Sequence, residues 1–123
     1  MRMGRLTTHV LNTADGVPGA GIIVELYVET SEAGTVGLRL VKTLVTNDDG
    51  RCDAPLLEGD AFVKGIYELH FMAGAYFSAR GVSGNEPPFL DRIVLRVGLS
   101  DPQQHYHVPL LVSPFSYSTY RGS

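Results

Sequence analysis

Cysteine and tryptophan are almost absent from this sequence of 123 residues, which contains one cysteine, Cys52, and no tryptophan. A single cysteine excludes an internal disulfide framework and any zinc site that needs several cysteines. Cys52 directly follows Arg51, and a neighbouring cation lowers the pKa of a thiol. A small buried thiol is nevertheless the favoured interpretation of Cys52, because free cysteines usually pack as small apolar side chains.

Long apolar runs and an excess of basic residues are also missing. No stretch approaches the roughly 18 consecutive apolar residues that a membrane helix requires, and no apolar segment with a cleavage site follows the amino terminus. The chain has 10 Lys and Arg against 13 Asp and Glu, a net charge of −3, whereas nucleic-acid-binding domains normally present a basic face. We therefore expect a cytoplasmic protein that has neither a membrane nor a nucleic acid as its partner.

Several catalytic signatures are absent as well. The sequence contains no Gly-x-Ser-x-Gly nucleophile elbow, no phosphate-binding loop and no glycine-rich dinucleotide fingerprint. A chain of 123 residues has the length of one domain and leaves no room for a separate cofactor domain. The sequence therefore indicates a single domain over residues 1–123, for which no cofactor is expected.

What the sequence does contain is a series of short strand-like segments separated by glycine and proline. The composition, 44% apolar and 19% charged, is typical of a globular protein with a core. Residues 73–80 are the one stretch that favours a short helix, ending before Gly81. Apolar and polar residues alternate in most of the predicted strands, which cover residues 6–11, 22–29, 37–46, 65–72, 92–99, 105–112 and 115–120. About seven strands with mostly short connections predict an all-β fold, an antiparallel β-sandwich.

Pro109 lies within the predicted strand 105–112 and bears on assembly. Proline has no N–H to donate to a sheet ladder, so its presence predicts an edge strand or a bulge. This strand is also rich in aliphatic residues, and an exposed apolar edge promotes aggregation unless it is covered. A second subunit is the simplest cover, and the sequence therefore predicts an oligomer.

Histidines are the main candidates for chemistry. His105 and His107 are two residues apart on a predicted strand, so both side chains leave the same face. Two titrating groups on one face suit either metal binding or the activation of water, and the spacing alone does not choose between them. His9 lies within the first predicted strand and is a third candidate, whereas His70 is isolated and is expected to be structural.

Two arginines stand where the chain turns or ends. Arg51 follows the turn 47–50, Asn-Asp-Asp-Gly, where a fixed cation suits an anionic group or an oxyanion; a solvated turn arginine is the alternative. Arg121 belongs to the closing tetrapeptide 120–123, Tyr-Arg-Gly-Ser. Chain ends are usually frayed, so this concentration of polar groups directly after a strand suggests that the end is held in a site.

Four segments carry a resemblance to a known family. They are residues 6–11 (Leu-Thr-Thr-His-Val-Leu), 46–51 (Thr-Asn-Asp-Asp-Gly-Arg), 105–111 (His-Tyr-His-Val-Pro-Leu-Leu) and 117–123 (Tyr-Ser-Thr-Tyr-Arg-Gly-Ser). Together, from end to end, they resemble the transthyretin-like family of 5-hydroxyisourate hydrolases. The resemblance implies a transthyretin β-sandwich of two four-stranded sheets with one short helix. It also implies a homotetramer whose active sites lie at the dimer–dimer interface.

The resemblance further implies a reaction and the residues that perform it. The reaction is the hydrolytic ring opening of 5-hydroxyisourate, the product of urate oxidation, to 2-oxo-4-hydroxy-4-carboxy-5-ureidoimidazoline in purine catabolism. The catalytic residues implied are His9, Arg51 and His107, without a metal. The residues implied to bind substrate or shape the site are His105, Tyr120, Arg121, Gly122 and Ser123.

Two other functions fit parts of the pattern. A non-catalytic carrier of the same fold would bind a small apolar ligand, but its channel would be lined by apolar side chains rather than by histidines and an arginine. A zinc-dependent hydrolase would use His9, His105 and His107 as ligands and a zinc-bound water as the nucleophile.

Overall fold

The computed structural model describes residues 4–82 and 85–122. Within these ranges the chain forms mostly strands, with the α-helix α1 (Ala73–Ala79) and a short 3-10 helix η1 (Gly59–Ala61). The strands are β1 (Arg5–Asn12), β2 (Val17–Pro18), β3 (Ile23–Glu32), β4 (Thr35–Val45), β5 (Leu57–Glu58), β6 (Gly65–Met72), β7 (Arg92–Leu99), β8 (His105–Val112) and β9 (Tyr117–Thr119). The predicted strands and helix are all confirmed. The strands β2 and β5 were not predicted, because two residues are too few to show alternation.

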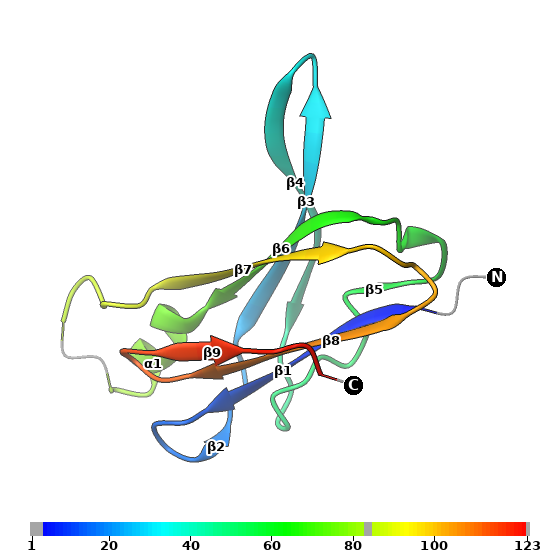
Figure 1. Cartoon of the computed structure of the whole chain (residues 1–123). Coiled ribbons are helices and arrows are strands. Elements are labelled where there is room, and N and C mark those ends of the chain that lie inside the picture. The colour runs from blue at the N-terminus through cyan, green and yellow to red at the C-terminus, as the bar shows by residue number, and fades with distance from the viewer. Residues whose placement is uncertain (1–3, 83–84, 123) are drawn as a thin grey trace.

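The strands form two sheets packed as layers (Figure 1). One sheet has the order β2-β1-β8-β9, with β5 also pairing with β1, and the other has the order β4-β3-β6-β7. Neighbouring strands are antiparallel except for β1 and β8, which run parallel with Arg5 opposite His105 and Asn12 opposite Val112. The predicted β-sandwich is therefore confirmed, and it contains one parallel pair and a fifth strand in one sheet.

Alternation along the strands separates the core from the outer face. Leu6 and Val10 of β1 and Leu110 of β8 are fully buried between the sheets. They join one apolar cluster with side chains from the second sheet and from α1, among them Leu26, Leu69, Phe71 and Phe77. Because successive side chains of a strand point to opposite faces, the odd-numbered residues of β1 and β8 leave the sheet on its outer side.

The strand that contains Pro109 is internal, because β8 pairs with β1 on one side and with β9 on the other. Of the two predicted positions for the proline, an edge strand or a bulge, the edge strand is therefore wrong. The proline instead interrupts the ladder between β8 and β9. Pairing ends at Leu110 and resumes with an isolated bridge between His107 and Gly122. The missing N–H explains the gap, and the hydroxyl of Thr119 donates a hydrogen bond to the Pro109 carbonyl at 2.7 Å.

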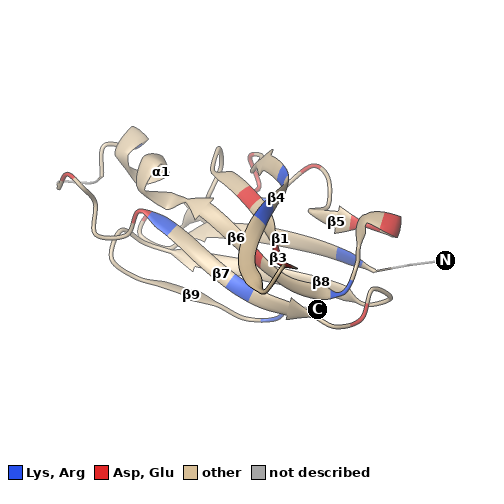
Figure 2. Cartoon of the chain, turned by 90° about the horizontal axis from the view of Figure 1, so that it is seen from above, with Lys and Arg blue, Asp and Glu red and all other residues tan. Residues whose placement is uncertain are grey.

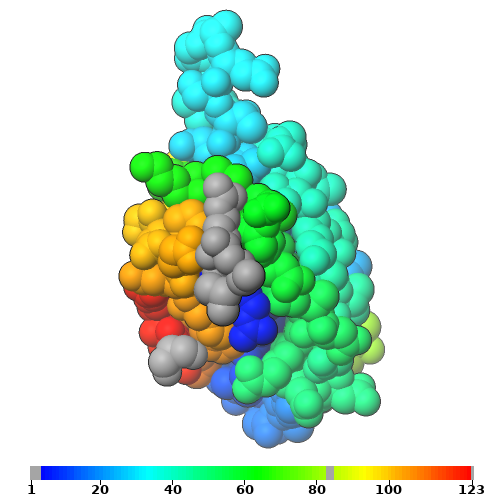
Figure 3. Space-filling model, turned by 90° about the vertical axis from the view of Figure 1, so that its right-hand side faces the viewer, coloured from blue at the N-terminus to red at the C-terminus, as the bar shows by residue number. Residues whose placement is uncertain are grey.

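β3 and β4 form a long hairpin whose end projects from the body of the sandwich (Figures 1 and 3). The sequence predicts a loose turn over residues 30–35, but strand pairing continues as far as Glu32 opposite Thr35. Only Ala33 and Gly34 form the turn, with φ angles of 52° and 80°. Two positive φ angles are typical of the tight turns that match the twist of paired strands, which is why the ladder extends so far.

Charged side chains are spread over the molecule rather than gathered on one face. Figure 2 shows Lys and Arg on β1, β4 and β7, with Asp and Glu between them. Across residues 4–82 and 85–122, no helix has the length and apolar character that a membrane crossing requires.

Candidate active site

Two neighbouring strands place most of the predicted site residues on one surface, the outer face of the five-stranded sheet. The parallel register sets Thr7 of β1 opposite His107 of β8, and Arg5 opposite His105. His9 follows Thr7 on the same face of β1. Residues about a hundred positions apart in the sequence therefore become neighbours through the pairing of β1 with β8.

The turn over residues 47–51 brings Arg51 to this surface. The side-chain oxygen of Asn47 accepts hydrogen bonds from the backbone N–H groups of Asp49 (2.9 Å) and Arg51 (3.2 Å), which closes the turn. Nε2 of His9 donates a hydrogen bond to the backbone carbonyl of Asp49 at 2.9 Å, since a carbonyl can only accept. His9 and Arg51 also face each other in an isolated antiparallel bridge. The turn thus fixes both residues.

Gly50 allows this turn to approach β1 closely. Its φ angle is 78°, and a Cβ at this position would overlap the carbonyl oxygen of Val10. The Val10 N–H in turn donates a hydrogen bond to the Gly50 carbonyl at 2.8 Å. A larger residue would push the turn away from the strand, so glycine is required here for both backbone conformation and space.

A hydroxyl group lies between the two histidines of β8. Oγ1 of Thr7 is 2.9 Å from Nε2 of His105 and 2.8 Å from Nδ1 of His107. The ring centroids of the two histidines are 6.4 Å apart. Because Thr7 engages Nδ1 of His107, the other ring nitrogen, Nε2, is the one left to act on a ligand.

The carboxyl-terminal tail lies against His107. The Gly122 N–H donates a hydrogen bond to the His107 carbonyl at 2.7 Å. A Cβ on Gly122 would come within 2.7 Å of Cδ2 of the histidine ring, so only glycine allows this approach. Ser123, which is also a predicted site residue, lies outside the described residues.

Arg121 is not brought to the surface that the other candidates share. Its guanidinium lies 4.3 Å from the ring centroid of Tyr106, and its Nη2 donates a hydrogen bond to the side-chain oxygen of Gln104 at 2.8 Å. Tyr106 points into the core, on the opposite side of the sheet from His107. In this single chain the guanidinium is therefore not part of the surface that carries His107, and a role of Arg121 in binding substrate stays a prediction. The guanidinium instead anchors the tail through a cation–π contact.

An open cavity of about 470 Å³ lies over this surface. The predicted site residues in its wall are Arg51, His105, His107, Tyr120 and Gly122, joined by Arg5, Thr7 and Cys52. His9 adjoins this wall through its bridge to Arg51. Among the described residues, no Asp or Glu side chain lines the cavity, whereas two guanidinium groups do. Cationic walls without carboxylates favour an anionic, oxygen-rich ligand.

The pKa of His107 lies below the ordinary histidine value of 6.5. The main cause is partial burial, which disfavours the charged ring, and the positive charges of Arg51, His105 and His9 act in the same direction. His107 is therefore neutral at pH 7, with a lone pair available to accept a proton.

Cys52 contributes a protonated thiol to the cavity wall. Burial raises the pKa of Cys52, and the nearby carboxylate of Asp53 raises it further. This agrees with the expected unreactive thiol, although the side chain is half-buried rather than fully buried.

The histidines engage protein atoms rather than one another. His9 bonds to a backbone carbonyl, while His105 and His107 share the hydroxyl of Thr7. Within the part of the chain that the structure describes, no three His, Cys, Asp or Glu side chains are grouped as ligands for one metal ion. The arrangement suits proton transfer and anion binding by the side chains themselves.

Sequence reasoning missed two residues of this surface, Arg5 and Thr7. Threonine is common in strands, so Thr7 has the character of an ordinary strand residue. The available signal was its parity: residues 5, 7 and 9 share one face, and that face carries His9. The pairing of β1 with β8, which brings Thr7 to His107, is not visible in the sequence.

Comparison with known proteins identifies the family. Residues 6–122 match the HIUase/Transthyretin family. The 5-hydroxyisourate hydrolase of Pseudomonas aeruginosa is 58% identical over 122 residues, which cover 98% of this chain and 93% of that protein. The structure of Klebsiella pneumoniae 5-hydroxyisourate hydrolase is 30% identical with a TM-score of 0.77, and the match covers 100% of this chain and 96% of that one. The structure of an (S)-allantoin synthase is 48% identical with a TM-score of 0.87 over 98% of this chain, which spans only 44% of that longer protein. With nearly its whole length matched, the chain belongs to the HIUase/Transthyretin family.

Proposed function

We propose that this chain, as a single domain over residues 1–123, hydrolyses 5-hydroxyisourate to 2-oxo-4-hydroxy-4-carboxy-5-ureidoimidazoline in urate catabolism. The observation that carries the proposal is that His107, whose pKa is lowered by burial, and the guanidinium-bearing Arg51 line one cavity to which no described carboxylate contributes. The 5-hydroxyisourate hydrolase of Pseudomonas aeruginosa, at 58% identity, supports the choice of substrate.

His107 acts as the general base. Ring opening requires water to attack a carbonyl carbon, with a proton leaving the water as the new bond forms. Nε2 of His107 accepts that proton and later returns it to the ring nitrogen whose bond to the carbonyl breaks. His9, which Asp49 holds in place, completes the pair that orients the water. Such proton transfer typically contributes about two to four orders of magnitude in rate.

Arg51 stabilises negative charge on the substrate oxygens. The turn that carries Arg51 is closed by Asn47 and docked on β1, so the backbone position of the cation is set before substrate binds. One positioned donor of this kind is commonly worth roughly 3 kcal/mol in the transition state. His105, Tyr120 and Gly122 line the remaining wall, with Arg121 anchoring the tail from the other side of the sheet.

We further propose that the active form is a cytoplasmic homotetramer with its sites at the dimer–dimer interface. The cavity of the single chain is open to solvent, and a second copy would close it. Phe89 and Phe115 are 72% and 67% exposed, and their rings lie 6.2 Å apart. They flank β7 and β9, the last strands of the two sheets. Exposed aromatic pairs of this kind are typical of subunit contacts. Light scattering should give the mass of four chains, whereas a fully active monomer would contradict the assembly.

The two alternatives predict different behaviour. A carrier would bind a small ligand without consuming it, and its cavity would be lined by apolar side chains rather than by Arg51 and His107. A zinc hydrolase would lose its activity when the metal is removed.

An ultraviolet time course on freshly prepared 5-hydroxyisourate tests the proposal directly. We expect the absorbance of the substrate to decay faster with the protein than without it, and at a rate that grows with protein concentration. Decay at the spontaneous rate would reject the hydrolase. The same assay after chelation, alongside a zinc determination on the purified protein, separates the mechanisms: loss of activity together with zinc would support the zinc enzyme.

A further inference from the structure

Among the described residues, Thr7 is the one side chain that is hydrogen-bonded to both histidines of β8, and the mechanism above leaves it without a role. Its Oγ1 is 2.9 Å from Nε2 of His105 and 2.8 Å from Nδ1 of His107. A threonine hydroxyl has one hydrogen to donate and lone pairs to accept. Thr7 can therefore donate to one histidine while it accepts from the other. The orientation of this hydroxyl ties the protonation state of His105 to that of His107.

For His107 to act as a base through Nε2, its proton must sit on Nδ1. Nδ1–H then donates to Oγ1 of Thr7, and the Thr7 hydroxyl donates to Nε2 of His105. In the opposite orientation, Nε2 of His105 donates to Thr7, and the proton of His107 sits on Nε2, where it is an acid. One rotation of the Thr7 hydroxyl, with the accompanying proton shifts, thus distinguishes the base form of His107 from its acid form.

We infer that Thr7 is a positioning residue that relays a proton between His107 and His105 during catalysis. This inference rests on the proposed hydrolase function. When Nε2 of His107 takes a proton from water, the Nδ1 proton moves to Oγ1 of Thr7, and the hydroxyl proton moves to Nε2 of His105. His105 then carries the positive charge. When Nε2 of His107 gives its proton to the departing ring nitrogen, the two relay protons return and the enzyme is restored.

The environments of the two histidines favour transfer of the positive charge from His107 to His105. His105 is exposed, whereas His107 is partly buried. The charged and titratable groups around the pair, among the described residues, are Arg5 and His9 on β1, Arg51 and Cys52 after the turn, and Tyr120 in the tail. Arg51 lies among the groups that disfavour a charge on His107. Moving the charge to His105 places it where water solvates it, which stabilises the enzyme between the two proton transfers.

Substitutions at Thr7 test the relay kinetically. Thr7→Val removes the hydroxyl and keeps the shape, and we expect it to lower kcat about 100-fold with little change in KM. Thr7→Ser keeps the hydroxyl and should recover most of that loss. Thr43→Val, at an exposed threonine on β4, is the matched control and should leave kcat unchanged. A Thr7→Val enzyme with the wild-type kcat would overturn the relay, as would a Thr7→Ser enzyme that is as slow as Thr7→Val.

Nitrogen-15 NMR of the histidine rings tests the same relay without substrate. In the wild-type protein we expect the proton of neutral His107 on Nδ1, and Thr7→Val should alter the ring signals of both His105 and His107. A proton on Nε2 of His107, or unchanged signals in the variant, would overturn the inference even if the variant cannot be assayed. If the wild-type protein fails to hydrolyse 5-hydroxyisourate, the proposed function fails, and the NMR result still decides whether Thr7 couples the two rings.

Discussion

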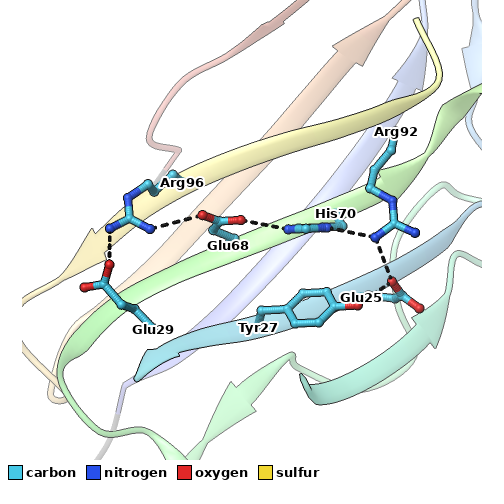
Figure 4. A network of polar contacts seen from close by, with 7 residues as sticks. All are labelled: Glu25, Tyr27, Glu29, Glu68, His70, Arg92 and Arg96. Atoms are coloured by element: carbon cyan, nitrogen blue, oxygen red, sulfur yellow. Dashed lines mark hydrogen bonds and ion pairs between the residues drawn. The ribbon is translucent and has the colours of Figure 1, made fainter. Parts of the chain in front are cut away.

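The two sheets of the sandwich carry histidines on their outer faces in opposite electrostatic settings. On the four-stranded sheet, His70 belongs to a polar network of side chains from β3, β6 and β7 (Figure 4). Its Nε2 donates to Glu68 at 2.9 Å, and its Nδ1 accepts from Arg92 at 3.2 Å. The network continues through the ion pairs of Arg96 with Glu68 and Glu29 and of Arg92 with Glu25, whose carboxylate accepts a hydrogen bond from Tyr27.

On the five-stranded sheet, His107 has one hydroxyl partner and cations around it. Both ring nitrogens of His70 are occupied, whereas His107 keeps Nε2 for a ligand. The carboxylates account for the difference. Glu68 and Glu25 pair with the arginines of the four-stranded sheet, whereas none of the described residues that line the cavity beside Arg51 is an Asp or Glu, which leaves the guanidinium available to an anion. The same residue types thus give a structural network on one sheet and a candidate active site on the other.

Replacing His107 and His70 by asparagine, one at a time, is the strongest test of the difference between the two sheets. We expect His107→Asn to lower kcat by about two to four orders of magnitude, because no other group replaces the base. His70→Asn should retain most of the activity and lower the thermal midpoint, because it removes the hydrogen bonds that the buried His70 ring makes to Glu68 and Arg92. Steady-state kinetics and thermal unfolding of both variants measure the two effects. Equal losses of activity in the two variants would show that His107 is no more important for catalysis than His70.

Removing the positive charge of Arg51 from the cavity wall should have the next largest effect on activity. Arg51→Gln is expected to reduce kcat/KM about 100-fold, because the oxyanion loses its charged donor. Arg39→Gln, at an exposed position on the projecting hairpin, serves as the control and should leave the rate unchanged. A wild-type rate for Arg51→Gln would show that this arginine is only a solvated turn residue.

The pH dependence of the reaction sharpens the electrostatic side of the comparison. A base must be neutral to accept a proton, so activity should fall as the pH drops through the pKa of His107. Because burial and Arg51 lower that pKa, the acid limb of kcat/KM should lie below pH 6.5. Residual activity of Arg51→Gln should show an acid limb at higher pH, since one cause of the depression is gone. An acid limb above pH 6.5 in the wild type would contradict this environment for His107.

The smallest effect is expected from substitutions in the polar network around His70. Glu68→Gln removes the carboxylate between His70 and Arg96, and we expect a loss of about 1 kcal/mol in the free energy of unfolding. Glu32→Gln near the tip of the hairpin should cost less, and neither change should alter kcat. Urea denaturation with parallel assays measures both quantities. A strong loss of activity in Glu68→Gln would assign that sheet a part in catalysis.

Most of the fold was predictable because the strands alternate cleanly, and the Asn-Asp-Asp-Gly turn before Arg51 is readable from its residue types alone. Pairing was not predictable: Pro109 suggested an edge, yet β8 is internal, because the proline leaves a gap in only one of its two ladders. The same holds for the candidate site: residue types could be recognised in the sequence, whereas strand pairing could not. His9, Arg51 and His107 stand out as residue types, whereas Thr7 acquires its importance only from the register of β1 with β8.

In β1 and β8, whether a substitution affects stability or the cavity depends on whether the residue number is even or odd. Leu6, Val10 and Leu110 occupy even positions and determine stability, while Thr7 and His107 occupy odd positions and face the cavity. Substitutions at odd positions can therefore reshape the ligand surface without reaching the interior. An insertion or deletion within either strand, by contrast, exchanges the two sets and abolishes folding and chemistry in one step.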